Sequence, residues 1–130
     1  MGSAAIPVRA IVAGHGTFAS GIVSAVEQIA GRGDLFATVS NTGLSLDDIQ
    51  QTLSRALDDS GARVIFTDLP AGSCTMAVRR LLRERPGVLL VTGINLSLLL
   101  DFAMHDGDDP VQAAQAALER GRASMTVHGA

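Results

Sequence analysis

Apolar positions along the chain follow two alternating patterns, which predict short strands separated by helices. Near-continuous apolar runs, several of them rich in β-branched residues and closed by glycine, are typical of strands buried on both faces. The helical segments instead carry apolar residues three or four positions apart, as at Phe18, Ile22, Val26 and Ile29. The predicted strands cover residues 8–13, 35–39, 63–67 and 88–93, with a fifth, short strand over 123–128.

Capping residues mark where the predicted helices begin. Ser45 is followed three positions later by Asp48, which resembles an N-terminal capping box. Asp109 precedes Pro110, an acidic cap before proline in the first turn. Ser73 is predicted to cap the third helix. The predicted helices cover residues 18–30, 46–60, 73–85, 95–104 and 110–120.

The alternation of strands and helices predicts a single-domain α/β fold. Near-continuously apolar strands separated by helices indicate an open, mostly parallel sheet with helices on both faces. The expected sheet has four parallel strands plus the short C-terminal strand. We place the domain at residues 8–128 and interpret residues 1–7 as a disordered lead or an expression remnant.

Composition removes several function classes. All ten basic residues are arginine, so a Walker A phosphate loop and Schiff-base chemistry, which need lysine, are excluded. The net charge of −3 argues against nucleic acid as a partner. The longest apolar runs are far shorter than the about 18 residues of a membrane span, and the N-terminus lacks the pattern of a secretory signal. We therefore expect a cytoplasmic protein that meets a membrane only indirectly.

Candidate chemistry lies in the loops that follow the strands. In open parallel sheets, ligands bind beyond the carboxyl ends of the strands. That rule selects residues 14–17, residues 68–73 and Asn95. His15 stands between two glycines at a strand-to-helix turn, where the functional interpretation is a nucleophile or proton carrier and the alternative is a surface histidine.

Asp68 and Ser73 complete the candidate site. If the first and third strands are neighbours, the Asp68 carboxylate can fix one imidazole nitrogen of His15 and leave the other as the nucleophile. Asp68 could instead only start a turn. Gly72 and Ser73 open a helix whose free N–H groups favour an anion. Together with the helix start after His15, this set suits a phosphoryl group on histidine, with no metal and no cofactor.

Three segments carry a resemblance to a known family. They are residues 11–21, 66–73 and 91–96, each following or ending a predicted strand, and the likeness extends over about residues 8–125. The chain resembles the IIA component of the mannose/fructose/sorbose-type family of the phosphoenolpyruvate-dependent sugar phosphotransferase system (PTS). It departs from the family at Ala71, where glycine is usual, at Cys74 and Met76, and at Ser97, where proline is frequent.

The resemblance implies a phosphocarrier. His15 would accept a phosphoryl group on Nε2 from phospho-HPr, with Asp68 orienting the ring from the other nitrogen. Gly16, Thr17, Gly72 and Ser73 would bind the phosphoryl group, which would pass to a IIB protein or domain during sugar uptake. The family also implies a homodimer, in which the strand over 123–128 would pair with the partner's sheet.

Other readings stay open at this point. A regulatory phosphohistidine protein and a phosphocarrier for a dihydroxyacetone kinase are alternatives, as is a tetrapyrrole chelatase or small-ligand binding module. Cys74 could be a reactive thiol or a small buried residue, of which we favour the second. Residues 105–109 are interpreted as a solvated acidic loop rather than a metal site, and an arginine cluster at 79–83 as a solvated face or a steering patch.

Overall fold

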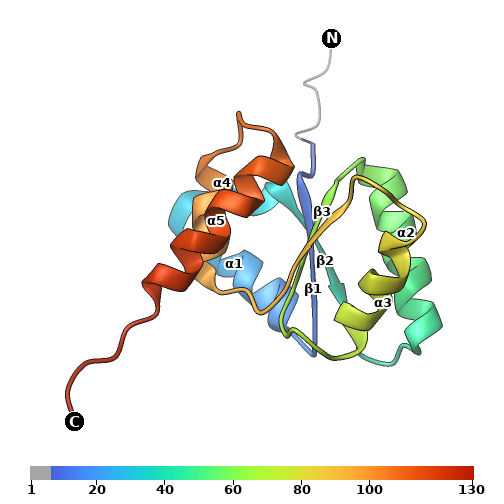
Figure 1. The fold of residues 1–130 in the computed structure, drawn as a ribbon, viewed down its shortest axis with the longest axis horizontal. Helices are drawn as coiled ribbons and strands as arrows, with labels where there is room; N and C mark the ends of the chain where they lie inside the picture. The colour runs from blue at the N-terminus through green and yellow to red at the C-terminus, as the bar shows by residue number, and fades with distance from the viewer. Residues whose placement is uncertain (1–6) are drawn as a thin grey trace.

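The computed structural model describes residues 7–130, which form a parallel sheet between two layers of helices (Figure 1). The strands are β1 (Ala10–Gly14), β2 (Phe36–Ser40), β3 (Val64–Thr67) and β4 (Leu89–Val91). The helices are α1 (Phe18–Ala30), α2 (Leu46–Ser60), α3 (Ser73–Leu82), α4 (Leu96–Met104) and α5 (Pro110–Ser124), with a short 3-10 turn at Gly33–Leu35. The predicted α/β class is confirmed.

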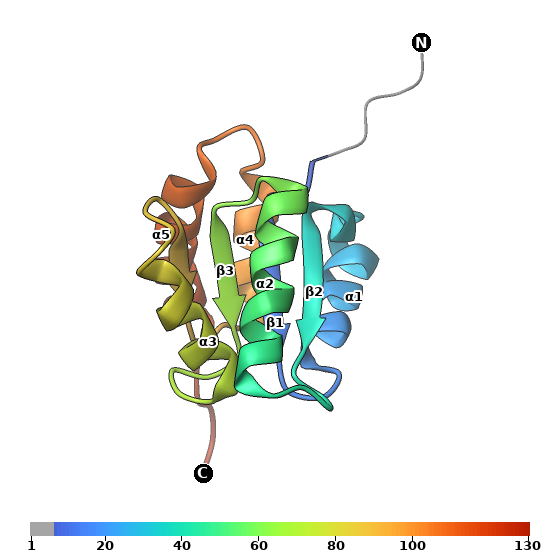
Figure 2. The same cartoon turned by 90° about the vertical axis from the view of Figure 1, so that its right-hand side faces the viewer.

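All strand pairings are parallel, and the strand order is β2-β1-β3-β4. The first strand therefore lies between the second and the third, with Ile11 beside Ala37 on one side and Ile65 on the other. The carboxyl ends of β2, β1 and β3 consequently lie next to one another at one edge of the sheet, toward which the arrowheads of β2 and β3 point in Figure 2.

The pleat of β1 divides its side chains between two cores. Ala10 and Val12 pack with α1, α4 and α5, whereas Ile11 and Ala13 pack with α2 and α3. This assignment follows from the period of two in a strand, and all four side chains are fully buried. The two helical layers are visible on opposite sides of the sheet in Figure 1. Burial on both faces explains why the strand sequences are apolar without interruption.

The predicted starts of two helices are confirmed. Ser45 and Asp48 form both hydrogen bonds of a capping box at the start of α2, and Asp109 caps α5 with proline at the first position. The prediction that Ser73 caps α3 is wrong. The cap position is Gly72, and Ser73 is the first helical residue. The physical reason is that the Ser73 hydroxyl accepts a hydrogen bond from Asn41 instead of from its own helix.

The predicted C-terminal strand over 123–128 is wrong for this single chain. Within residues 7–130, α5 continues to Ser124 and residues 125–130 have no regular structure. The last helical turn is held because Asn95 and Ser124 both donate to the Gly121 carbonyl, at 2.9 and 2.8 Å. A strand there would need a sheet edge to satisfy its backbone groups, and in the described part of the chain residues 125–130 pair with no strand of the sheet.

The predicted domain start falls at the edge of the described part of the chain. Residues 1–6, most of the predicted lead, lie outside the described residues, so the boundary stays a prediction. Among residues 7–130, the structure contains no helix with the length and apolar character needed to span a membrane.

Candidate functional site

Three segments meet at the carboxyl edge of the sheet: residues 14–17 at the end of β1, 40–45 at the end of β2 and 68–72 after β3. The backbone N–H of Asn41 donates to the Gly14 carbonyl at 3.1 Å, which joins the first two loops. The His15 backbone N–H donates to the Asp68 carboxylate at 2.9 Å, which joins the first and third. The sequence-based prediction that the His15 and Asp68 loops meet therefore agrees with the observed pairing of β1 with β3.

His15 and Asp68 form the central pair of this edge. The Nδ1 atom of His15 lies 2.8 Å from Oδ2 of Asp68, the same oxygen that accepts the His15 backbone N–H. The imidazole is 46% exposed and the carboxylate 10% exposed. Because the carboxylate accepts from Nδ1–H, the neutral ring carries its lone pair on Nε2. The exposed ring thus presents a nucleophilic nitrogen on the side away from Asp68.

The Asp68 carboxyl is kept ionised by its contacts with His15. Burial is the largest single influence and on its own raises the pKa of Asp68. The backbone and side-chain hydrogen bonds from His15, together with the attraction of its charged form, outweigh burial and leave the pKa of Asp68 lowered. The carboxylate therefore remains a hydrogen-bond acceptor and a negative charge beside the imidazole at neutral pH.

Two glycines leave room for this pair. A Cβ at Gly14 would lie 2.7 Å from Phe18 Cδ1 and 3.0 Å from Asp68 Oδ2, so a side chain there would displace the carboxylate. Gly72 has a φ of +111°, a backbone conformation that side chains disfavour, and its Cβ would lie 3.1 Å from His15 Cε1. The Cε1–Nε2 edge of the ring therefore faces bare backbone at the start of α3.

Two buried threonines shape the loop that presents Gly72. Thr67 and Thr75 are fully buried, and their hydroxyl oxygens lie 2.7 Å apart. Thr75 also donates to the Leu69 carbonyl at 2.5 Å. These bonds satisfy polar groups inside the core and tie the end of β3 to the first turn of α3. Sequence reasoning missed both residues, because a threonine in an apolar run gives no sign of its partner.

The predicted phosphoryl-binding residues lie on two sides of the imidazole. Gly16 and Thr17 follow His15, and the Gly16 carbonyl accepts from the Ser40 hydroxyl at 2.8 Å. Ser73 follows Gly72 and accepts from the Asn41 amide at 3.1 Å. The first N–H groups of an α-helix have no intrahelical acceptor, so the starts of α1 and α3 both offer donors at this edge.

Asn95, which the loop rule also selected, has a different role. Its side chain accepts from the Leu98 backbone N–H at 3.0 Å and donates to the Gly121 carbonyl. It therefore caps α4 and holds α5. The loop after β2 was not selected from the sequence, although its polar run from Ser40 to Gly43 marks a turn at a strand end.

Cys74 is a buried packing residue. Its side chain is inaccessible, and burial, together with the negative charge of Asp68, raises the pKa of the thiol to about 11. The thiol is therefore protonated and inert at neutral pH, as favoured from the sequence.

The acidic loop at residues 105–109 forms ion pairs at the opposite edge of the sheet. Arg32 pairs with Asp106, and Arg63 pairs with Asp109. The loop is therefore tied to the segments that precede β2 and β3, and its Asp109 also caps α5. Among residues 7–130, no three His, Cys, Asp or Glu side chains group closely enough to hold a metal ion.

The arginine cluster lies on the exposed face of α3. Arg80 pairs with Asp47 of α2 at 3.3 Å, while Arg79 and Arg83 are exposed. Met76, one turn nearer to Gly72, is 53% exposed. The exposed face of α3 therefore begins next to Gly72, at the His15 edge, and runs along the helix toward Arg83.

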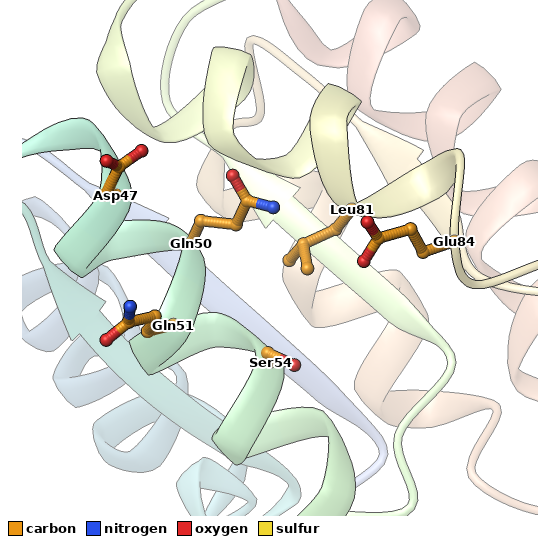
Figure 3. Close-up of a pocket in the computed structure, with 6 residues that line it drawn as sticks. All are labelled: Asp47, Gln50, Gln51, Ser54, Leu81 and Glu84. Carbon is orange, nitrogen blue, oxygen red and sulfur yellow. The ribbon is translucent and has the colours of Figure 1, made fainter.

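A surface cleft of about 340 Å³ lies between α2 and α3 (Figure 3). It contains no residue of the His15 site. Its lining residues are Asp47, Gln50, Gln51, Ser54, Leu81 and Glu84.

Comparison with solved structures shows the same fold in PTS components. A phosphotransferase system component EIIA from Streptococcus agalactiae has a TM-score of 0.83 at 22% identity, covering 92% of this chain and 95% of that one. The mannose/sorbose specific IIA subunit from Enterococcus faecalis has a TM-score of 0.80 at 16% identity, covering 96% and 97%. A PTS IIA protein associated with the fucose utilization operon of Streptococcus pneumoniae has a TM-score of 0.78 at 23% identity, covering 96% of each.

Sequence comparison identifies the family. Among curated proteins, none matches this chain. The family profile described as PTS system fructose IIA component, however, matches residues 9–119. The matched range runs from β1 into α5 and includes the whole His15 edge. Because the match spans most of the chain, this protein belongs to the family of PTS fructose IIA components, the mannose-type EIIA family.

Proposed function

We propose that the protein is a phosphocarrier that receives a phosphoryl group on Nε2 of His15 from phospho-HPr and passes it to a IIB protein or domain for sugar uptake. Family membership supports a phosphotransfer component of a sugar PTS. The observation that carries the assignment to His15 is its geometry. Nδ1 is held by Asp68 at 2.8 Å, while the Cε1–Nε2 edge faces the Gly72 backbone.

The proposed step needs no group besides the two proteins. The Nε2 lone pair of His15 attacks the phosphorus of the donor's phosphohistidine, so one N–P bond forms as the donor's N–P bond breaks. The electron pair of the broken bond stays on the donor imidazole. His15 keeps its Nδ1 proton and becomes a positively charged phosphoimidazole, which the Asp68 carboxylate stabilises. Transfer to IIB reverses the same exchange.

The surroundings of Nε2 supply hydrogen-bond donors for the phosphoryl oxygens. In the proposal these are backbone N–H groups of Gly16, Thr17, Gly72 and Ser73, together with the Ser73 hydroxyl. Partial positive charge at the starts of α1 and α3 favours the anion, an effect of about 0.3–1 kcal/mol at an exposed helix end. Such donors replace the lysine that the chain lacks.

An assay of phosphoryl transfer tests the proposed function directly. Incubation with phosphoenolpyruvate, enzyme I and HPr is expected to add one acid-labile phosphate to the wild type and none to His15→Ala. His105→Ala is the matched control, because it removes an exposed histidine at the other edge of the sheet and is expected to label fully. Labelling that persists in His15→Ala, or a wild type that takes up no phosphate, would contradict the proposal. Transfer of the labelled phosphate from His15 to a IIB protein tests the second step of the proposal.

The proposal includes two further predictions from the sequence. The protein acts in the cytoplasm, where its donor would be found. It also forms a homodimer in which the C-terminal segment over residues 123–128 of one copy packs on the sheet of the other. Met125 and Val127 are 75% and 91% exposed, and β4 has a strand neighbour on one side only. Sedimentation of the full chain is expected to give a dimer, and a stable monomer would refute this part.

A further inference from the structure

The Ser73 hydroxyl has a fixed neighbour that the sequence did not single out. The side-chain amide of Asn41 donates to Ser73 Oγ at 3.1 Å. Asn41 lies in the loop after β2, and its backbone N–H donates to the Gly14 carbonyl at 3.1 Å, one residue before His15. One residue thus contacts both loops that frame the imidazole.

The loop that carries Asn41 is held by its own bonds. The Ser40 hydroxyl donates to the Gly16 carbonyl, and the Leu44 backbone N–H donates to the Asn41 carbonyl at 3.0 Å. Gly43, with a φ of +75°, closes the turn in a conformation open to glycine. The amide is therefore presented to Ser73 from a constrained turn, and its side chain is half-buried.

The hydrogen bond from Asn41 leaves the Ser73 proton free to donate elsewhere. A hydroxyl has one proton to donate and two lone pairs, and an amide NH₂ group can only donate. The Ser73 proton therefore cannot be directed at the Asn41 nitrogen. Among residues 7–130, Ser73 Oγ donates to no other residue. Ser73 follows Gly72, whose backbone faces the Cε1–Nε2 edge of His15.

We propose that Asn41 is a positioning residue for phosphoryl transfer. Its amide occupies a lone pair of the Ser73 hydroxyl, so that the Ser73 proton is held toward a phosphoryl group on Nε2 of His15. This inference rests on the proposed phosphorylation of His15 and adds a residue that acts through Ser73. The chemical consequence is a stronger donor to the phosphoryl oxygens, because a hydroxyl that accepts one hydrogen bond is polarised to donate the next.

The test measures the phosphoryl group itself and does not depend on any partner protein. The full chain is phosphorylated with phosphoramidate, and the phosphohistidine signal is followed by ³¹P NMR as a function of pH. A hydrogen-bond donor favours the dianionic phosphoryl group and lowers its titration midpoint. Ser73→Ala is expected to raise the midpoint, and Asn41→Ala to raise it in the same direction by a smaller amount.

Two further variants separate positioning from loop structure. Asn41→Asp keeps the shape of the side chain but offers only acceptors, so it is expected to draw the Ser73 proton away and raise the midpoint more than Asn41→Ala. Thr42→Val removes a neighbouring hydroxyl of the same loop that bonds to Ser40 and not to Ser73, and is expected to match the wild type. A shift in Thr42→Val as large as that of Asn41→Ala would overturn the proposal.

A double variant decides whether Asn41 acts through Ser73. In a Ser73→Ala background, Asn41→Ala is expected to cause no further shift, since the coupling between the two residues is then absent. A midpoint unchanged in Asn41→Ala, or a shift that persists without the serine hydroxyl, overturns the role of Asn41 while His15 phosphorylation stands. Failure of phosphoramidate to modify His15 in the wild type overturns both proposals.

Discussion

Two histidines in this chain, His15 and His105, lie beside an aspartate at opposite edges of the sheet, and only His15 lies at the carboxyl ends of the strands. His15 Nδ1 contacts the Asp68 carboxylate at 2.8 Å, across 53 residues of sequence. His105 Nδ1 instead contacts the Asp101 backbone carbonyl at 2.8 Å, with the carboxylate 3.9 Å away one helical turn earlier. The first pair depends on the fold, whereas the second is local to the end of α4.

The partners of the two aspartates also differ. Asp68 accepts both the backbone and the side-chain N–H of His15 on one oxygen, and its side chain is nearly buried. Asp101 also pairs with Arg120 at 3.6 Å, so its charge is shared with a permanent cation. The comparison shows that a histidine–aspartate contact alone does not define a site. What distinguishes His15 is its place at the strand ends, with bare backbone beside Nε2.

The largest expected effect comes from filling that space. Gly72→Ala places a Cβ 3.1 Å from His15 Cε1 and 3.7 Å from Nε2, where the phosphoryl group would be built. We expect phosphorylation by phospho-HPr to fall below detection. Gly87→Ala is the matched control, because Gly87 has a similarly positive φ of +94° but no atom within 4 Å of its Cβ position. Both variants carry backbone strain, so a similar loss of labelling in Gly87→Ala would show that strain, not obstruction, is responsible.

A smaller effect is expected from removing the charge beside His15. Asp68→Asn no longer selects the tautomer with Nδ1–H and no longer neutralises the phosphorylated ring, so the transfer rate is expected to fall by about a hundredfold. Asp101→Asn changes the equivalent partner of His105 and is expected to leave the rate unchanged. Stopped-flow or quench measurement of label transfer from phospho-HPr compares the two. Equal rates in Asp68→Asn and the wild type would remove Asp68 from the mechanism.

The fold could be predicted from the sequence because its signals are local. Buried strands need continuous apolar runs and helices need apolar stripes. Both patterns can be recognised in the sequence without knowing which elements pack against them. The strand expected over 123–128 failed for the opposite reason. A terminal strand exists only where a sheet edge receives it, and here α5 ends at Ser124 and the residues after it have no regular structure. The prediction that Ser73 caps α3 failed because the hydrogen-bond partner of its hydroxyl, Asn41, is 32 residues away in the sequence.

The candidate site was predictable only in part for a similar reason. His15 and Asp68 stand directly after apolar strands, so the rule for ligand position in parallel sheets found them. The same rule passed over Asn41 because its strand is short and its turn resembles an ordinary loop. Asn95 was selected, yet its side chain caps α4. Which strand end faces the histidine depends on the strand order, and no pattern in the sequence states that order.

The smallest effects are expected in the dependence of stability on pH. The stabilisation from the His15–Asp68 pair should be lost toward acid pH, and that from the His105–Asp101 pair toward alkaline pH. The pKa of Asp68 is lowered in the folded chain, so its contribution is present above the carboxyl's ordinary pKa and is lost as the pH falls through the lowered value. The pKa of His105 is raised, first by the hydrogen bond to the Asp101 carbonyl and then by the Asp101 charge, against the opposing effects of desolvation and then of Arg120. Its contribution is present below about pH 6.5 and is lost as the pH rises through the raised value.

Urea unfolding across this pH range should separate the pairs. His105→Gln is expected to be slightly less stable than the wild type near pH 5.5 and equal to it at pH 8.5, because the exposed pair is weakened by solvent and salt. Asp68→Asn is expected to reduce the dependence of stability on pH on the acid side, between about pH 5 and pH 3, and to leave the dependence near pH 7 unchanged. A difference between His105→Gln and the wild type that grows toward alkaline pH would reverse the sign assigned to the His105 pair, and the contrast between the two edges would then need another physical basis.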